Sequence, residues 1–403
     1  MKVPRVDLPN QFNVATHFVD RNVKEGRGGK TALLHEGKTY SYQDVLQAVN
    51  RFGNALRSLN VEMEDRVALL CLDSPEFVAA FFGAIKIGAV PIPMNTTLRP
   101  ADYEYMLQDS RAKVLVVHAA LWEPLRSIRD LFRHVRHIVV VGGAGEDLIS
   151  YEELIRDQSP TCLAADTSKD DVAFWLYSSG STGFPKGAVH LHHDMVYSAE
   201  LYSRPILQIQ EKDVTFSAAK LFFAYGLGNN LYFPFNVGAT AVLYPGRPLP
   251  DKMFEVIAAS RPTIFYGVPT LYAAMLQVAD AEERAADGKR PAPNEQAMQS
   301  VRVCVSAGES LPAPIFHRWK EKFALEILDG IGSTELLHIF ISNRIGDVRP
   351  GSSGKIVPGY EARIADEEGR VLPQGQVGNL LIKGDSAAAC YWNKHQKTKE
   401  TML

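Results

Sequence analysis

The chain has 403 residues, enough for two or three packed units, and its hydrophobic fraction of 46% and charged fraction of 22% are ordinary for a soluble globular protein. Its net charge of −3 argues against nucleic acid or an anionic membrane as a partner. The four cysteines are too widely spaced to be metal ligands and predict reduced thiols in a cytoplasmic protein. No signal-peptide pattern opens the sequence, and no apolar stretch approaches the length of a membrane span.

Helix and strand patterns alternate in the first half of the chain. Ser41 and Asp44 predict a capping box, and apolar residues then recur at helical spacing as far as Leu59. Ser74 and Pro75 predict the start of a second helix. The expected strands are the short apolar runs 67–72, 114–117, 138–141 and 172–176. Such alternation is typical of a mostly parallel sheet covered on both faces.

The same alternation resumes in the second half and then stops. The expected strands are 214–218, 239–244, 263–268, 301–306 and 325–328. Residues 280–296 are charged and show little periodicity, which predicts an exposed insertion. After about residue 346 glycines become dense, and runs at 360–365 and 377–383 predict a small antiparallel unit.

The predicted fold is therefore α/β, with two mostly parallel sheets flanked by helices and a small β-rich subdomain of distorted-barrel type. The expected subdomains are about 1–205, 206–345 and 346–403. Ligand sites are expected at the carboxyl ends of the strands.

A segment rich in glycine and hydroxyl residues follows the predicted strand 172–176. Residues 177–187 read Tyr-Ser-Ser-Gly-Ser-Thr-Gly-Phe-Pro-Lys-Gly. Glycines let backbone N–H groups turn toward a ligand, hydroxyls add donors, and Lys186 adds a positive charge, so the segment can cradle a triphosphate. It is not a Walker A loop, because Lys186 lies between Pro185 and Gly187. A flexible surface loop is the alternative for such a composition.

Three further loops follow predicted strands, and each is ambiguous alone. Residues 220–229 mix aromatic side chains with alanine and glycine, which suits a slot for a flat ring but also an ordinary core. Residues 306–309 (Ser-Ala-Gly-Glu) fit either the close approach of a planar base or a tight turn. In 329–335, Thr334 can donate to a phosphate, and Glu335 is either a hard oxygen ligand for Mg²⁺ or a residue in the first turn of a helix.

Taken together, the order and type of these loops resemble the motifs of the adenylate-forming superfamily, which contains acyl- and aryl-CoA ligases, luciferases and peptide-synthetase adenylation domains. Residues 379–384 and the Tyr391-Trp392 pair resemble its next motif, where the family more often has Glu at the position of Asn379. Segments 222–229, 331–340 and 388–393 are similar to those of benzoate-CoA ligases and their aryl relatives. The resemblance covers essentially the whole chain.

The resemblance implies a role for each loop. ATP and AMP would be bound by Ser178, Ser179, Gly180, Ser181, Thr182, Gly183, Lys186, Ser306, Ala307, Gly308, Glu309, Asp329, Gly330, Ile331, Gly332, Ser333 and Thr334. The aromatic acid would be surrounded by Ala224, Tyr225, Gly226, Gly330, Ile331, Gly332, Leu337 and His338. The catalytic residues would be Lys186, Thr334 on the α-phosphate and Glu335 on the metal.

The reaction implied by the resemblance activates benzoate or a close analogue with ATP and Mg²⁺ as an acyl-AMP and passes the acyl group to coenzyme A. The alternatives are a ligase for a hydroxybenzoate, an aminobenzoate or a cyclohexene carboxylate, or a non-catalytic adenylate-binding fragment. A kinase is disfavoured, because the chain has no Walker or kinase signature. The sequence leaves open whether His338 accepts from or donates to a ring substituent, and whether the protein is a monomer or a homodimer.

Family members carry further elements downstream: an aspartate that grips the ribose, a hinge, and a small C-terminal domain with a catalytic lysine. None of these is found in the sequence, so we expect the chain to be the large N-terminal domain of such an enzyme. On that expectation the chain binds the acid and turns over poorly.

The cluster His190, His192 and His193 invites a metal-site interpretation. No cysteine or further histidine nearby completes a ligand set, however. Ordinary residues at the start of a helix are the favoured interpretation.

Overall fold

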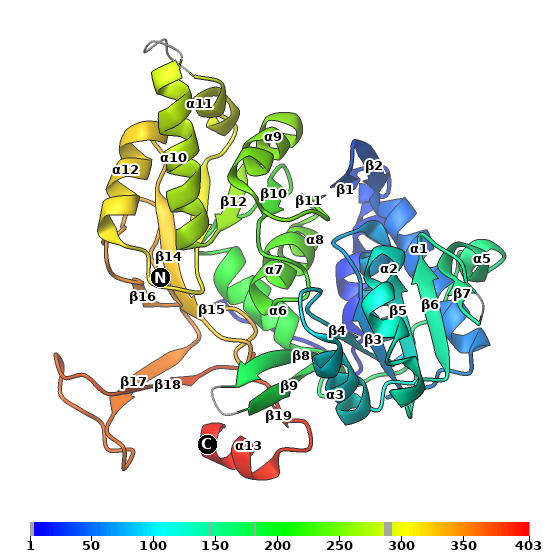
Figure 1. The fold of residues 1–403 in the computed structure, drawn as a ribbon. Coiled ribbons are helices and arrows are strands. Elements are labelled where there is room, and N and C mark those ends of the chain that lie inside the picture. The colour runs from blue at the N-terminus through cyan, green and yellow to red at the C-terminus, as the bar shows by residue number, and fades with distance from the viewer. Residues whose placement is uncertain (1–3, 146, 181–182, 286–291, 403) are drawn as a thin grey trace.

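The computed structural model describes residues 4–145, 147–180, 183–285 and 292–402. In these residues a large mixed sheet and a smaller parallel sheet are separated by helices, and further helices cover their outer faces (Figure 1). This is the α/β architecture that the alternation of strands and helices predicts.

The large sheet is parallel in its centre and antiparallel at both edges. Its strands, in spatial order, are β16 (Lys355–Ile356), β15 (Ile339–Ser342), β14 (Ile327–Gly332), β13 (Val303–Ser306), β12 (Ile264–Gly267), β10 (Val214–Ser217), β11 (Thr240–Leu243), β1 (Thr31–His35) and β2 (Lys38–Ser41). The N-terminal strand β1 pairs with β11, so residues 31–41 join the sheet built mainly from the second half of the chain. The division into subdomains stays a prediction.

The smaller sheet is parallel throughout. Its order is β4 (Val90–Pro93), β3 (Arg66–Leu70), β5 (Val114–His118), β6 (His137–Val141) and β7 (Ile149–Ser150). Two antiparallel groups complete the strands: β8 (Val172–Gly180) with β9 (Gly183–Leu191) and β19 (Cys390–Tyr391), and β17 (Glu361–Ala365) with β18 (Asn379–Lys383). In Figure 1 the β17–β18 ribbon projects away from the main body.

The helices alternate with the strands along the chain. The α-helices are α1 (Tyr42–Ser58), α2 (Pro75–Lys86), α3 (Pro100–Ser110), α4 (Glu123–Arg126), α5 (Tyr151–Arg156), α6 (Asp194–Ser198), α7 (Ala224–Leu227), α8 (Phe233–Val237), α9 (Pro250–Ser260), α10 (Pro269–Ala285), α11 (Pro293–Met298), α12 (Ala313–Phe323) and α13 (His395–Thr401). Short 3₁₀ and π turns are η1 (Thr16–Asp20), η2 (Val23–Arg27), η3 (Ala119–Leu121), η4 (Arg129–Leu131), η5 (Ala199–Ser203) and η6 (Gly228–Tyr232).

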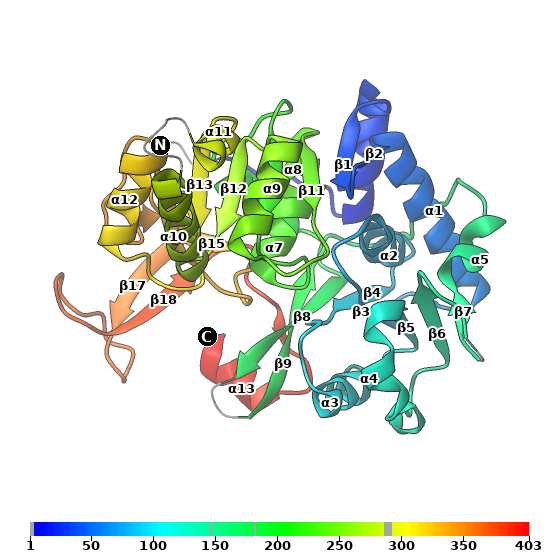
Figure 2. The same ribbon diagram turned by 45° about the horizontal axis from the view of Figure 1, so that its top comes forward.

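Apolar side chains bury both faces of the two sheets, and the inner faces share one core. Strand β13 illustrates the two-residue period: Val303 and Val305 enter the core between the sheets, whereas Cys304 faces the core beneath α9, α10 and α12. Figure 2 shows these three helices on the side of the large sheet away from the smaller sheet. A third core forms where α3 and α4 cover the outer face of the smaller sheet.

The strands and caps expected from the sequence are largely confirmed. Each expected strand range overlaps a strand of the structure. The capping box is present, since Ser41 Oγ accepts from the Asp44 N–H at 3.1 Å and Asp44 accepts from the Ser41 N–H at 2.8 Å. Ser74 caps α2, which has Pro75 at its first position.

The predicted insertion at 280–296 is mostly exposed or half-buried in its described parts, as expected, but these parts are helical. Helix α10 continues to Ala285 and α11 begins at Pro293. Asp280 forms ion pairs with Arg318 and with Lys322 of α12, the second at 2.8 Å. Charges that read as solvent-facing in the sequence therefore fasten one helix to another.

The interpretation of the histidines is corrected in part. His193 precedes α6 as its N-cap residue, as expected for the start of a helix. His190, by contrast, lies fully buried in strand β9, which continues past the glycine- and hydroxyl-rich segment to Leu191. In the part of the chain that the structure describes, no group of three or more potential ligands could hold a metal ion.

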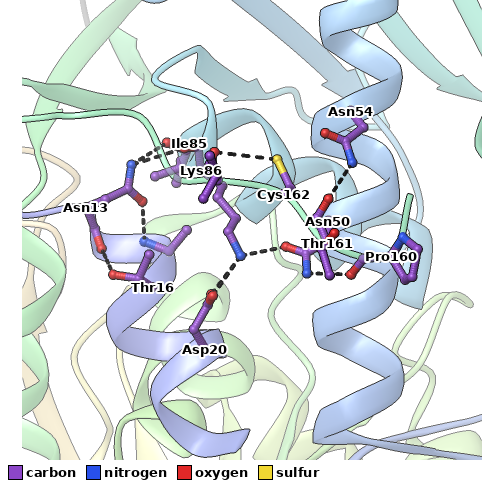
Figure 3. Close-up of polar contacts among 12 residues, drawn as sticks. Asn13, Thr16, Asp20, Asn50, Asn54, Ile85, Lys86, Pro160, Thr161 and Cys162 are labelled. Atoms are coloured by element: carbon purple, nitrogen blue, oxygen red, sulfur yellow. Dashed lines mark hydrogen bonds and ion pairs between the residues drawn. The ribbon is translucent and has the colours of Figure 1, made fainter. Parts of the chain in front are cut away.

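A buried lysine ties the N-terminal segment to the helical layer between the sheets (Figure 3). Lys86, at the end of α2, is 1% exposed and donates to both carboxylate oxygens of Asp20 at 2.8 and 3.0 Å and to Asn50 of α1. Asn50 and Asn54 in turn donate to the carbonyls of Pro160 and Thr161, each at 2.8 Å. The pairing compensates the buried charge and holds η1, α1, α2 and the segment after α5 together.

None of the helices in the described residues is both long and apolar enough to cross a membrane. The four cysteines form no disulfide in the described residues, and Cys71 and Cys304 are buried core residues.

Candidate functional site

The glycine- and hydroxyl-rich segment forms the end of the β8–β9 hairpin. Ser178 of β8 lies directly opposite Lys186 of β9, so their side chains emerge on the same face of the hairpin. Gly180 pairs with Gly183 next to the turn. The expected phosphate-binding residues Ser181 and Thr182 lie outside the described residues, and only the backbone of Ser179 and Gly180 is described.

The acidic segment forms a tight turn between β14 and β15. Ser333 Oγ accepts from the Leu336 N–H at 3.2 Å, and the Thr334 carbonyl accepts from the Leu337 N–H at 3.1 Å. A Cβ atom on Gly332 would lie 2.6 Å from the carbonyl oxygen of His338, so only glycine lets the two strands approach here. We call this turn, residues 333–338, the acidic tip.

The hairpin and the acidic tip are in direct contact. Ser178 Oγ donates to Glu335 Oε1 at 3.2 Å. His190, on the same strand as Lys186, donates from Nε2 to the Thr334 carbonyl at 2.8 Å, and its Nδ1 lies 2.8 Å from Asp194 Oδ2. The hairpin and the acidic tip therefore converge, as a shared triphosphate site would require, with His190 and Asp194 behind their contact.

A cavity of about 700 Å³ opens beside the acidic tip, at the carboxyl ends of the large sheet's strands. The expected site residues that line it are Ala224, Tyr225, Ala307, Gly308, Gly332, Ser333, Thr334 and His338. Lys220, Phe222 and Phe223, from the segment 220–229 predicted as a possible ring slot, also line it. The sequence analysis assigned no role to three other lining residues, Thr96, Thr97 and Pro245. Gly226, Gly330, Ile331 and Leu337 are not among its lining residues, and Leu337 is fully buried.

The aromatic wall of the cavity is held by hydrogen bonds to strand ends. Tyr225 donates from its hydroxyl to the carbonyls of Val305 and Gly267 at 3.1 and 3.3 Å. A Cβ atom on Gly226 would lie 2.1 Å from the Lys220 carbonyl oxygen, so glycine allows α7 to sit against the preceding turn. Gly226 thus shapes the wall without lining it.

His338 is neutral, and its single proton is already committed. Complete burial lowers the pKa of His338 to about 3. Its Nε2 lies 3.2 Å from the carbonyl oxygen of Tyr225 and 3.1 Å from Asn229 Oδ1, and a carbonyl can only accept, so Nε2 carries the proton. His338 therefore has no N–H left to donate to a ring substituent, which answers half of the question that the sequence left open.

The expected adenine-binding segments lie on neighbouring strands, since Ser306 of β13 pairs with Asp329 of β14. The Asp329 carboxyl is 4% exposed, accepts from Ser353 Oγ at 3.1 Å, and has its pKa raised to about 6 by burial. Ser306 is buried and its hydroxyl has no partner in the described residues, whereas Glu309 is exposed. Ser306 Oγ and one oxygen of Asp329 are thus buried polar atoms that still lack partners.

Two residues of the site, Tyr391 and Lys220, make contacts that could not be predicted from the sequence. Tyr391 donates to Glu335 Oε1 at 2.7 Å, and its ring centroid lies 4.8 Å from Lys186 Nζ. Lys220 lies 3.9 Å from the buried carboxylate of Asp73, at the end of β3. The sequence analysis noted Tyr391 as part of a motif and Lys220 as part of a loop, but residue spacing cannot predict these contacts.

The donor set at Glu335 fits Mg²⁺ held mainly by a nucleotide. Both hydrogen bonds to this carboxylate fall on Oε1, and within the described residues Oε2 has none. Mg²⁺ is usually bound through one or two carboxylates, with phosphate oxygens and water completing an octahedron. One free carboxylate oxygen beside a phosphate loop meets that requirement.

Comparisons with known proteins agree with this geometry. Residues 19–392 match the profile of the family described as AMP-binding enzyme. The chain is 50% identical to a benzoate–CoA ligase from Thauera aromatica over 402 residues, which are 99% of this chain and 74% of that protein. Among solved structures, the anthranilate CoA ligase AuaEII in complex with anthranoyl-AMP has a TM-score of 0.93 and 43% identity, covering 98% of this chain and 74% of its own.

The structure of a benzoate CoA ligase from Burkholderia xenovorans LB400 matches this chain with a TM-score of 0.87 and 45% identity. The match covers 97% of this chain and 75% of the ligase chain. The family match spans most of the chain, and the fold and the converging loops are consistent with it. The chain belongs to the AMP-binding enzyme family.

Proposed function

We propose that this chain activates benzoate or a close analogue with ATP and Mg²⁺ as an acyl-AMP and transfers the acyl group to the thiol of coenzyme A. The observation that carries the proposal is the hydrogen bond from Ser178 to Glu335, which joins the phosphate-loop hairpin to the acidic tip beside a cavity of about 700 Å³. The similarity to a benzoate–CoA ligase along nearly the whole chain supports the same reaction.

The proposed roles follow from the side-chain chemistry. Lys186 and Thr334 contact the phosphates, and Glu335 holds the metal, whose charge would offset that of the phosphates. Segments 178–183, 306–309 and 329–334 hold the nucleotide. The aromatic acid lies against Ala224, Tyr225, Gly332 and His338, and Gly226, Gly330, Ile331 and Leu337 support that wall.

The chain's residues act mainly by positioning and by offsetting charge. A carboxylate oxygen of the acid attacks the α-phosphorus, the new P–O bond forms, and pyrophosphate leaves with the electron pair of the broken bond. The thiol sulfur of coenzyme A then attacks the activated carbonyl carbon and forms a C–S bond, the thiol proton passes to water, and AMP leaves with the electron pair of the broken C–O bond. Holding the carboxylate against the α-phosphate turns the first step into an intramolecular one, which lowers its barrier.

Ligand-dependent stabilisation of the 403-residue chain tests the proposal. Thermal unfolding is measured with benzoate, ATP and Mg²⁺ separately and together, and with acetate replacing benzoate as the control. Since a ligand that binds only the folded state stabilises it by mass action, we expect benzoate with ATP and Mg²⁺ to raise the melting temperature more than either addition alone. Equal stabilisation by acetate, or none by ATP and Mg²⁺, contradicts the proposed function.

An aminobenzoate is the second candidate substrate. The structural likeness to an anthranilate CoA ligase supports it. The same unfolding assay with the three aminobenzoates and three hydroxybenzoates ranks them against benzoate. Because His338 has no N–H to offer, any preference for an amino or hydroxyl substituent through this residue must come from that substituent donating rather than accepting a hydrogen bond.

A further inference from the structure

We infer that Tyr391 is a positioning residue for the charged groups of the site: its hydroxyl orients the Glu335 carboxylate toward the metal, and its ring holds the Lys186 ammonium. This inference rests on the proposed function, because it assigns Tyr391 to the binding of ATP and Mg²⁺. The geometry behind it involves strand β19, which packs against β9 on the side away from β8.

The hydroxyl of Tyr391 fixes one oxygen of Glu335 and leaves the other open. Tyr391 is 3% exposed, and its O–H donates to Glu335 Oε1 at 2.7 Å, the shorter of the two hydrogen bonds on that oxygen. The phenol is the donor of this pair, because a carboxylate oxygen can only accept. A carboxylate bound in this way has a fixed orientation, as metal-binding carboxylates commonly have.

The ring of the same residue faces the catalytic lysine. Lys186 Nζ lies 4.8 Å from the ring centroid, within the range of a cation–π contact. In the described residues neither Lys186 nor Glu335 forms an ion pair, with each other or with any other side chain. Tyr391 contacts both of these opposite charges without joining them, so each stays available, Lys186 to a phosphate and Glu335 to a cation.

The backbone around Tyr391 is hydrogen-bonded both to the β8–β9 hairpin and to the acidic tip. Its strand pairs with β9, with Tyr391 opposite Ala188, and the Glu335 carbonyl accepts from the Ala388 N–H at 2.7 Å. Its own N–H donates to Thr398 Oγ1 of α13 at 3.0 Å. Removing the hydroxyl therefore leaves the segment in place and removes only the contact to the carboxylate.

The first test compares Tyr391→Phe with the parent chain. The variant keeps the ring and its contact to Lys186 but loses the donor to Glu335. We expect the Mg²⁺ concentration that gives half of the ATP-dependent thermal stabilisation to rise about tenfold, as for other hydrogen-bond partners of metal ligands. Benzoate binding without nucleotide, followed by calorimetry, stays within about twofold, because Tyr391 does not line the cavity. Tyr42→Phe, which removes a buried hydroxyl bonded to Ala239, is the matched control and leaves both readouts unchanged.

The second test asks whether Tyr391 acts through Glu335. In a Glu335→Gln background, Tyr391→Phe is expected to cause no further change in the Mg²⁺ midpoint, since the carboxylate that it orients is gone. An unchanged Mg²⁺ midpoint in Tyr391→Phe, or an equal shift in both backgrounds, overturns the inference. If Tyr391→Phe fails to fold by circular dichroism, Ser178→Ala removes the other donor to Glu335 Oε1 and must raise the Mg²⁺ midpoint in the same direction. A parent chain that shows no stabilisation by ATP and Mg²⁺ defeats the proposed function instead.

Discussion

The buried pair of Lys220 and Asp73 allows a prediction whose size follows from the structure. Asp73 is 2% exposed and accepts from the Leu221 N–H at 3.0 Å, and Lys220 Nζ lies 3.9 Å from its carboxylate. Burial raises the pKa of Asp73 to about 6, although Lys220 opposes that rise. Replacing Lys220 with methionine keeps most of the side-chain volume and removes the opposing charge, so the pKa of Asp73 should rise further.

The expected loss of stability depends on pH. The folded-state pKa of Asp73 lies above its ordinary value of 3.8, so its contribution to stability is fully present below about pH 3.8 and is lost as the pH rises through about 6. At about pH 7.5 this loss is about 3 kcal/mol in the parent. It approaches about 5 kcal/mol in a variant whose Asp73 carboxyl keeps its proton at that pH. Lys220→Met should therefore lower the free energy of unfolding by up to about 2 kcal/mol at about pH 7.5 and by less than about 0.5 kcal/mol at about pH 5.

Urea unfolding at the two pH values measures this difference. Combining Lys220→Met with Asp73→Asn should remove the pH dependence of the loss, because the asparagine does not ionise and still accepts from Leu221. Lys252→Met, at an exposed lysine paired with Glu255, is the control and should cause no pH-dependent loss. An equal loss at both pH values for Lys220→Met would refute the reasoning and assign Lys220 to packing alone.

Three further predictions concern the cavity, the acidic tip and a buried histidine. Ala224→Leu adds three carbon atoms to a residue that lines the cavity, so calorimetry should find benzoate affinity reduced at least about tenfold; an unchanged affinity would rule out this placement of the ring. Gly332→Ala should cost about 1–3 kcal/mol in urea unfolding, because its Cβ atom meets the His338 carbonyl, whereas Gly29→Ala, in open space, should cost under about 1 kcal/mol. Burial lowers the pKa of His192 to about 4, so its contribution to stability is present above about pH 6.5 and is lost as the pH falls toward 4. When the pH is lowered from about 7 to 5, the free energy of unfolding of His192→Gln should therefore fall by about 2 kcal/mol less than that of the parent. Parallel pH profiles of the two proteins would contradict this.

The positions of the strands could be predicted from the sequence, whereas most of their partners could not. A short apolar run between turn residues is a local signal, and it identified the central strands of both sheets. The pairing of β1 with β11 joins Leu33 to Ala241, and no local pattern encodes a contact over such a separation. The same limit explains why residues 183–191 were not expected to form a strand. This segment contains glycines and Pro185, which disfavour strands, but its pairing with β8 outweighs that composition.

In the segment 280–296 the charges and weak periodicity hid two helical pieces, the end of α10 and the start of α11. Its charges suggest solvent, but Lys322 of α12 lies 2.8 Å from Asp280 and 2.7 Å from Glu283. Ion pairs between helices are invisible to a reading of either helix alone. The end of α10 is therefore ordered by a helix that begins almost thirty positions later.

Some residues of the candidate site can be predicted from their residue type, whereas others can be found only from their position in the folded chain. Glycine, hydroxyl and lysine residues in one short segment indicate phosphate binding, so the sequence predicts this role for Ser178 and Lys186. His190 and Tyr391 reach Thr334 and Glu335 across 144 and 56 positions, and nothing in their own segments points there. These two residues hold the acidic tip from the hairpin side, away from the aromatic wall.

This arrangement implies that the two halves of the site can be separated by mutation. Changes at His190 or Tyr391 act on the acidic tip and should weaken the binding of ATP and Mg²⁺ while leaving benzoate binding intact. A change at Ala224 acts on the aromatic wall and should do the reverse. If substitutions on either side altered both affinities equally, the cavity and the hairpin would form one cooperative unit, and the separate roles argued from the contacts would not hold.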